Sequence, residues 1–384
     1  MHPYASLPSR SFWRTALGER APDAPLAAPV EGLWSPAFAL GADEPVLTAG
    51  SCFARHIGPA LREEGMHWYE AELPPPGLTP AERDARQYGH YSFRTGSLYT
   101  AAALLQWLRW AFGEAEPPRE VWEEDGRFFD PYRPSVEPDG HAAPADVLAA
   151  RERTLEAVRR GVAEAGCLVF TLGLTEAWRD TADGTVHQVC PGTVRGTFDP
   201  DRHALHQFTA AEVHRDLAAA VALARRAAPG LRVLLTVSPV PLTATATGAH
   251  VLTATCYAKS VLRVAAGQLA QESPYVDYFP AYELVTGHPF RGAAYGPNLR
   301  TVSPDGVAFV MRHFFAALRD EPHPGPHPGP HPGPAPAPAP GSDSGEDVSC
   351  EDAVLDYYSP DRREGDGGPG GRPGGGTGQV PPAR

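Results

Sequence analysis

The strongest constraint on the fold is a regular alternation of strand and helix patterns between residues 45 and 318. Residues 166–172 and 232–237 are continuous apolar runs, typical of strands buried on both faces of a sheet. Residues 148–164 and 210–228 have the apolar spacing of amphipathic helices. This alternation predicts an α/β fold with a parallel sheet that helices cover on both faces.

Shorter patterns complete the prediction. Further strands are expected at 46–49, 67–72 and 276–279, and further helices at 52–64, 97–112, 253–271 and 303–318. We expect five parallel strands in the order 2-1-3-4-5, the flavodoxin-like three-layer arrangement. The polar, turn-rich segment 180–208 does not fit the alternation, and we interpret it as a long loop or hairpin near the carboxyl edge of the sheet.

Three regions are expected along the chain: an N-terminal extension (1–44), a folded domain (45–320) and a C-terminal tail (321–384). The tail contains Pro/Gly repeats that cannot bury enough apolar surface to fold, so we expect it to be disordered. Its three regularly spaced histidines offer at most weak metal binding, and drift of the repeat explains them better; they are His323, His327 and His331.

The composition excludes several classes of protein. A net charge of −13 argues against a nucleic-acid partner. No apolar run is long enough to cross a membrane, and the first residues lack the pattern of a secretory signal. The 5 cysteines form no CxxC pair, which indicates neither a disulfide framework nor a zinc site. We expect a cytoplasmic protein with reduced cysteines.

Gly50 and Ser51 stand where the first expected strand meets the first expected helix. This geometry lifts a serine hydroxyl to the carboxyl edge of the sheet, where the first N–H groups of the helix face whatever the serine attacks. Ser51 is therefore the candidate nucleophile. Cys52 is a possible alternative, although its position favours packing between sheet and helix.

Residues 50–54 (GSCFA) resemble the signature that names the GSCFA family, which is similar to the SGNH (GDSL-like) ester hydrolases. The resemblance extends over about residues 45–318. It also includes residues 173–178 (GLTEAW), 190–193 (CPGT), 236–241 (TVSPVP) and 260–263 (SVLR).

The resemblance implies roles for several residues. Ser51 corresponds to the nucleophile of the first block, and Gly89 to the glycine that helps to form the oxyanion hole. Thr175 stands where SGNH hydrolases usually have an asparagine, a replacement that GSCFA relatives share. The loops that carry these two positions add further candidate binding residues: His90, Gly173 and Glu176.

The last block departs from the hydrolase pattern. SGNH hydrolases have Asp-x-x-His shortly before the final helix, where this chain has Asn298 and Thr301. A threonine cannot accept the proton of Ser51 at neutral pH, and an asparagine cannot stabilise an imidazolium. Without a base, a serine is a weak nucleophile, so the resemblance implies impaired activity.

Another residue could replace the missing base. His288, ten residues before Asn298, is the first candidate, and His187 and His90 follow it. Each histidine also has a simpler interpretation as a loop residue bonded to water or backbone. Glu176 and Glu283 could serve as base or orienter, or could pair with Arg179 and Arg291. We expect Lys259 to lie on a solvated helix face.

Two main hypotheses follow. The first is a serine esterase or acyl-transfer enzyme that attacks an acyl ester of a small molecule or glycan through Ser51, with no cofactor or metal. The second is a non-catalytic relative that binds a carbohydrate or acylated ligand. A third, weaker hypothesis gives the acidic tail a role in assembly.

Overall fold

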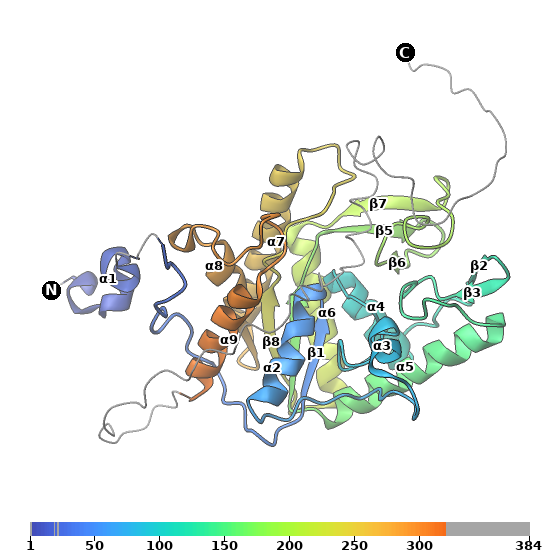
Figure 1. Cartoon of the computed structure of the whole chain (residues 1–384), viewed down its shortest axis with the longest axis horizontal. Helices are drawn as coiled ribbons and strands as arrows, with labels where there is room; N and C mark the ends of the chain where they lie inside the picture. The colour runs from blue at the N-terminus through green and yellow to red at the C-terminus, as the bar shows by residue number, and fades with distance from the viewer. Residues whose placement is uncertain (1, 19, 21–22, 320–384) are drawn as a thin grey trace, which may run out of the picture.

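A four-stranded parallel sheet forms the centre of the molecule. The structure is a computed structural model that describes residues 2–18, 20 and 23–319. The strands are β1 (Val46–Gly50), β4 (Cys167–Leu172), β8 (Arg232–Val237) and β9 (Val276–Phe279), hydrogen-bonded in that order. Helices flank this sheet (Figure 1). The predicted α/β class is confirmed, whereas the tail and its histidines lie outside the described residues.

The expected second strand is reduced to a single bridge. Trp68 pairs in parallel with Val46 on the free edge of β1, and the pairing goes no further. Ser92 occupies the next position along that edge, because its N–H donates to the Thr48 carbonyl and its hydroxyl accepts from the Thr48 N–H. The spatial order follows the prediction for four strands, and the prediction of a fifth strand is wrong.

Alternate residues of the strands bury two cores. Leu47 and Ala49 face a core with the helices α4 to α7, whereas Val46 faces a second core with α2, α8 and α9. The first set of helices is α4 (Ala101–Ala111), α5 (Pro144–Glu164), α6 (Ala210–Ala227) and α7 (Val251–Glu272); the second is α2 (Ile57–Glu63), α8 (Ala281–Thr286) and α9 (Pro304–Arg319). None of the described helices has the length and hydropathy that a membrane crossing requires.

Shorter elements complete the described chain. They are the helices α1 (Trp13–Leu17) and α3 (Pro80–Ala85), the 3-10 helices η1 (Pro3–Ser6), η2 (Ser9–Ser11), η3 (Cys52–His56) and η4 (His288–Phe290), and the hairpin β2 (Trp122–Glu124) and β3 (Arg127–Phe129).

The segment interpreted as a loop or hairpin contributes strands to a small antiparallel sheet. Its strands are β5 (Glu176–Asp180), β6 (Val186–His187) and β7 (His203–Gln207), in the order β6-β5-β7. The side chain of Gln106 on α4 bonds both the N–H and the carbonyl of Val186, which attaches β6 to the first core.

Part of the expected N-terminal extension packs on the domain. The Asp277 carboxylate on β9 accepts hydrogen bonds from the Trp34 indole and the Ala37 N–H, at 3.1 and 2.8 Å. The Val30 N–H donates to His313 Nε2 on α9 at 2.9 Å. Residues 30–40 therefore cover the second core, and the division of the chain at residue 44 stays a prediction.

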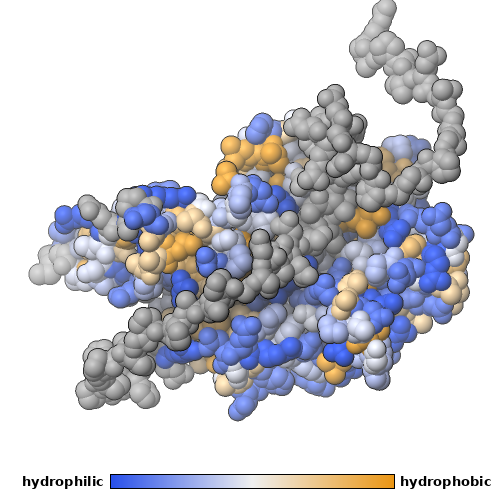
Figure 2. Space-filling view, in the orientation of Figure 1, coloured by the Kyte–Doolittle hydropathy of each residue, from blue (hydrophilic) through white to orange (hydrophobic). Residues whose placement is uncertain are grey.

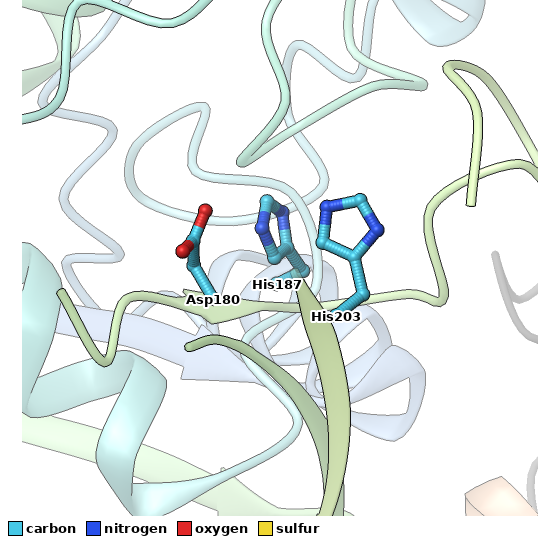
Figure 3. A group of neighbouring side chains, drawn as sticks. All are labelled: Asp180, His187 and His203. Atoms are coloured by element: carbon cyan, nitrogen blue, oxygen red, sulfur yellow. The ribbon is translucent and has the colours of Figure 1, made fainter. Parts of the chain in front are cut away.

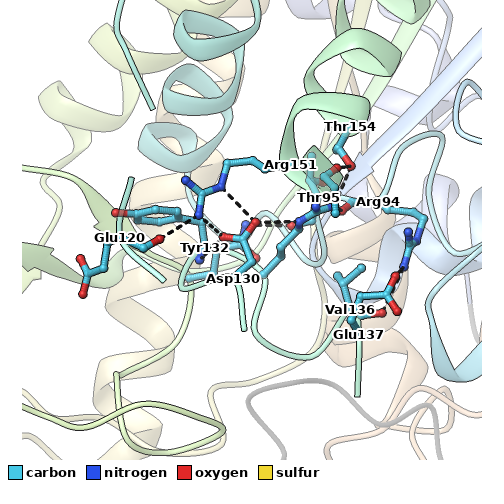
Figure 4. A network of polar contacts seen from close by, with 12 residues as sticks. Arg94, Thr95, Glu120, Asp130, Tyr132, Val136, Glu137, Arg151 and Thr154 are labelled. Carbon is cyan, nitrogen blue, oxygen red and sulfur yellow. Dashed lines mark hydrogen bonds and ion pairs between the residues drawn. The ribbon is translucent and has the colours of Figure 1, made fainter. Parts of the chain in front are cut away.

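A buried ion network anchors the long loop before α4 (Figure 4). The Asp130 carboxylate pairs with Arg133 at 2.9 Å and Arg151 at 2.8 Å. Arg133 also donates to the Arg94 carbonyl at 3.0 Å and to the Thr154 hydroxyl at 2.6 Å. Through these contacts, helix α5 holds the loop before α4, and this loop lies beside the end of β1.

Candidate functional site

The turn after β1 places Ser51 at the carboxyl end of the sheet. Gly50 has a φ of +130°, and a Cβ there would lie 2.3 Å from the Thr171 carbonyl oxygen, so only glycine fits. The Ser51 N–H donates to the same carbonyl at 2.9 Å. Ser51 is also the N-cap residue of η3, which continues directly into α2. The strand–turn–helix geometry inferred for Ser51 is therefore present.

The Ser51 hydroxyl is buried without a hydrogen-bond partner among the described residues. The residue is only 2% exposed. Gly173 lies directly opposite, since a Cβ on Gly173 would lie 2.8 Å from the Ser51 Cβ. The hydroxyl thus stays uncommitted, because no described side chain accepts its hydrogen.

The segment beside Ser51 follows Gly96 rather than Gly89. The Leu98 N–H donates to the Gly50 carbonyl at 2.8 Å, and the Tyr99 carbonyl accepts from the Gly173 N–H at 2.9 Å. Gly96 has a φ of +70°, which turns the chain just before this contact. A glycine close to the Thr100 cap of α4 is the sequence signal that could have identified the segment.

Gly89 and His90 lie near the helix that follows Ser51. Gly89 has a φ of +76°. The His90 Nε2 lies 2.6 Å from the Asp84 carboxylate and 2.9 Å from Arg55 on η3. Burial and the Arg55 charge lower the pKa of His90, against the pull of Asp84, so the ring is neutral at pH 7.

Thr175 and Glu176 hold neighbouring segments in place. The buried Thr175 hydroxyl accepts a hydrogen bond from Gln207 on β7 at 2.7 Å. The Glu176 carboxylate accepts from the Thr245 hydroxyl at 2.6 Å and from the Ala246 N–H at 3.2 Å. The two side chains therefore tie β7 and the segment around Thr245 to the carboxyl side of β4.

The two altered positions of the last block bond to each other. Asn298 Nδ2 donates to the Thr301 hydroxyl at 2.9 Å. Asn298 Oδ1 accepts from the N–H groups of Arg300 and Thr301, at 3.0 and 2.9 Å. The pair forms a closed turn in which neither group can act as a base.

Thr301 and the start of η3 line one small cavity. The lining residues are Cys52, Phe53, His56, Val240, Arg300, Thr301 and Val302. The last block therefore reaches the helix that Ser51 caps. Burial and the adjacent Arg55 lower the pKa of His56 to about 4, so a neutral imidazole lies in this cavity at pH 7.

His288 lies against the N-terminal segment. Its ring stacks on Trp13 of α1 with centroids 5.0 Å apart, in a groove that Leu17, Arg20 and Arg291 also line. These contacts do not involve the turn that carries Ser51. The role of His288 as substitute base stays a prediction. Glu283, the other candidate in this part of the chain, pairs with Arg263 at 2.5 Å and with the Tyr278 hydroxyl at 2.8 Å.

Lys259 is buried, and the expectation that it lies on a solvated face is wrong. It is 1% exposed, and its Nζ donates to the Gly173 carbonyl at 2.7 Å. Helix α7 packs on the face of the sheet beside β8 and β9, and this packing encloses the side chain. A buried amine is therefore separated from Ser51 by a single glycine.

The sequence that forms these elements matches a known family. The model of the GSCFA family matches residues 45–314, most of the chain. The chain belongs to the GSCFA family. The matched part of this GSCFA protein runs from β1 into α9 and includes Ser51, Gly173, Asn298 and Thr301. Neither a curated protein nor a solved structure matches it significantly.

Proposed function

We propose that this GSCFA domain is a serine ester hydrolase or acyl-transfer enzyme with low intrinsic activity. The observation that carries the proposal is the Ser51 hydroxyl, which is buried and unpartnered at the junction of strand and helix. The proposed substrate is an acyl ester, with esters of a sugar or polysaccharide as the first candidates, because the family is similar to the SGNH ester hydrolases. We also propose a cytoplasmic location.

In the proposed reaction, the Ser51 Oγ attacks the acyl carbon and the ester C=O becomes an oxyanion. We expect N–H groups at the start of η3 to face this position and to stabilise the negative charge without a side-chain partner. When the intermediate collapses, the ester C–O bond breaks, the leaving oxygen takes the proton that Ser51 lost, and the alcohol departs from an acyl-serine. Water or an acceptor hydroxyl then takes the acyl group and restores Ser51.

The weak step is removal of the Ser51 proton. An unassisted serine hydroxyl is a poor nucleophile, and only the contribution of the oxyanion hole and of binding remains, on the order of a thousandfold over water in well-studied proteases. Asn298 and Thr301 bond to each other and supply no base. We therefore expect slow acylation and slow turnover.

The alternative is a site that binds a carbohydrate or acylated ligand without chemistry. The residues at the last block favour this alternative. Asn298 and Thr301 bond to each other and replace the carboxylate and the imidazole that would activate Ser51. The position of Ser51 favours the enzyme, because its uncommitted hydroxyl lies at the junction of strand and helix, where a nucleophile is presented to a substrate.

Incubation with a fluorophosphonate probe, followed by peptide mapping, tests the proposal. We expect slow covalent labelling at Ser51 that is absent from Ser51→Ala. The matched control is Ser238→Ala, because Ser238 follows β8 as Ser51 follows β1, and labelling should persist there. Absence of label at Ser51, in protein that binds an acylated glycan, would support the non-catalytic alternative.

A further inference from the structure

Three buried polar side chains meet in the small antiparallel sheet, and one of them is His187, a candidate base in the sequence analysis. They are Asp180 on β5, His187 on β6 and His203 on β7. One carboxylate oxygen and one nitrogen of each ring all lie within 4.8 Å of one another. Figure 3 shows the His187 ring between the Asp180 carboxylate and the His203 ring.

Three of the four histidine nitrogens in this cluster lack a well-formed hydrogen bond among the described residues. His187 is 0% exposed, and neither of its ring nitrogens makes a hydrogen bond of good geometry, although the Pro131 backbone lies beside the ring. The Nε2 of the buried His203 has none either. Buried polar atoms are almost always satisfied in native proteins, so three unsatisfied ring nitrogens side by side indicate a missing ligand.

Two aromatic rings pack on the His187 ring. It stacks between Trp122, with centroids 5.9 Å apart, and Tyr132, at 5.4 Å. The faces of the ring are therefore covered by carbon, and its nitrogens lie along the edge. An imidazole nitrogen is the commonest protein ligand of a transition metal.

We propose that Asp180, His187 and His203 form a binding site for a divalent transition-metal ion, with Zn²⁺ as the ion that fits best. Two imidazole nitrogens and one carboxylate oxygen form a common set of three protein ligands for zinc, and leave a fourth position for water. The ligand atoms lie farther apart than in a closed site, so the side chains move together when the ion binds.

One existing hydrogen bond of His203 must adjust for the ion. His203 Nδ1 accepts a hydrogen bond from the Asp199 N–H at 3.0 Å, which in the neutral ring places the hydrogen on Nε2. Binding through Nε2 moves that hydrogen to Nδ1 and releases the Asp199 N–H. Asp199 is only partly buried, so water can accept this hydrogen bond instead.

Arg202 competes with the ion for the carboxylate. Its guanidinium bonds Asp180 at 2.5 Å and Glu120 at 3.1 Å. The two carboxylates outweigh the one arginine, so the local charge is negative and suits a cation. Removal of Arg202 should therefore strengthen metal binding, whereas a merely structural cluster would gain no affinity for an ion.

Zinc titration of the full chain tests the proposal. All proteins carry His323→Ala, His327→Ala and His331→Ala, because the tail histidines are a separate source of weak binding. We expect one equivalent of Zn²⁺, and a tetrahedral absorption spectrum with Co²⁺. His187→Phe keeps the aromatic stack and should weaken binding on the order of a hundredfold or more.

Two further variants sharpen the test. His206→Gln is the matched control. His206 lies on β7, the strand that carries His203, but it pairs with Glu212. The zinc affinity of this variant should equal that of the parent. Arg202→Gln should bind zinc several-fold more tightly, even if His187→Phe fails to fold. Absence of stoichiometric zinc from the parent, equal affinity in folded His187→Phe, or no gain in Arg202→Gln would overturn the proposal.

Discussion

Gly173 contacts Ser51 so closely that no side chain fits between them. A Cβ on Gly173 would lie 2.8 Å from the Ser51 Cβ and 3.3 Å from the Tyr99 carbonyl oxygen. The ends of β1 and β4 and the segment before α4 thus meet around one hydroxyl. A methyl group on residue 173 would displace the Ser51 side chain, so the position of the hydroxyl depends on Gly173.

Gly173→Ala should displace the Ser51 turn. Overpacking of this kind costs about 1–3 kcal/mol of unfolding free energy. We expect a lower thermal midpoint together with slower fluorophosphonate labelling of Ser51. Gly230→Ala is the control, because a Cβ at Gly230 meets no atom within 4 Å. Unchanged labelling of Gly173→Ala would show that the contact does not position the serine.

Ser51→Ala should leave the protein as stable as the parent or raise its stability by about 1 kcal/mol, because it removes a buried hydroxyl that has no partner. Ser238→Ala should have the opposite effect, since the Ser238 hydroxyl accepts a hydrogen bond from the Val240 N–H at 3.3 Å. Denaturant unfolding of both variants measures the difference. A clear loss of stability in Ser51→Ala would reveal a partner for the hydroxyl in solution.

Restoration of the last block should restore hydrolysis. Asn298→Asp with Thr301→His places a carboxylate beside an imidazole in a turn where the two residues already bond. We expect hydrolysis of a short-chain aryl ester to rise by on the order of a hundredfold, the usual effect of a positioned general base. Thr301→His alone should recover part of this gain, because the carboxylate mainly orients the imidazole.

The same assay tests His288 as a substitute base. If the parent protein is as slow as proposed, His288→Ala should leave its rate unchanged, because the His288 ring stacks on Trp13. Ordinary enzymatic turnover in the parent that disappears in His288→Ala would instead identify His288 as the base. The impaired-activity proposal would then be wrong.

The ion network around Asp130 should add to the free energy of unfolding at neutral pH and lose this contribution in acid. Burial alone raises the pKa of Asp130, but the charges of Arg151 and Arg133 outweigh it and lower the pKa below the ordinary 3.8. The carboxylate therefore stabilises the fold fully above about pH 5, and this contribution disappears as the pH falls through the ordinary value and then the lowered one.

Asp130→Asn should cost about 3–5 kcal/mol at neutral pH, because it leaves two buried arginines without their partner. Glu152→Gln breaks an exposed pair with Arg159 and should cost less than about 1 kcal/mol. Urea unfolding at pH 7 and pH 3 measures both variants. The gap between Asp130→Asn and the parent should narrow at the lower pH.

The strands were predictable because their signal is local. The apolar run 232–237 coincides with β8, and β9 has the bounds 276–279 that its pattern indicates. The fifth strand failed for a long-range reason, since Ser92 takes the edge of β1 that residues 69–72 would need. Competition for one edge leaves no trace in the sequence of either segment.

The site was only partly predictable. Ser51 could be identified because a single turn between strand and helix determines its geometry. The structure contains this turn at Gly50 and Ser51. The burial of Lys259 could not be predicted, because it depends on how α7 packs against the sheet. The meeting of His187 and His203 was equally hidden, since sixteen positions and an intervening loop separate two residues that pair with the same strand.

The hydrogen bond from Lys259 to the Gly173 carbonyl ties the Ser51 turn to a helix of 22 residues. The segment 239–250 precedes α7 and determines where that helix begins. A change in the length of this connection would therefore shift α7 and, through Lys259 and Gly173, displace the hydroxyl of Ser51.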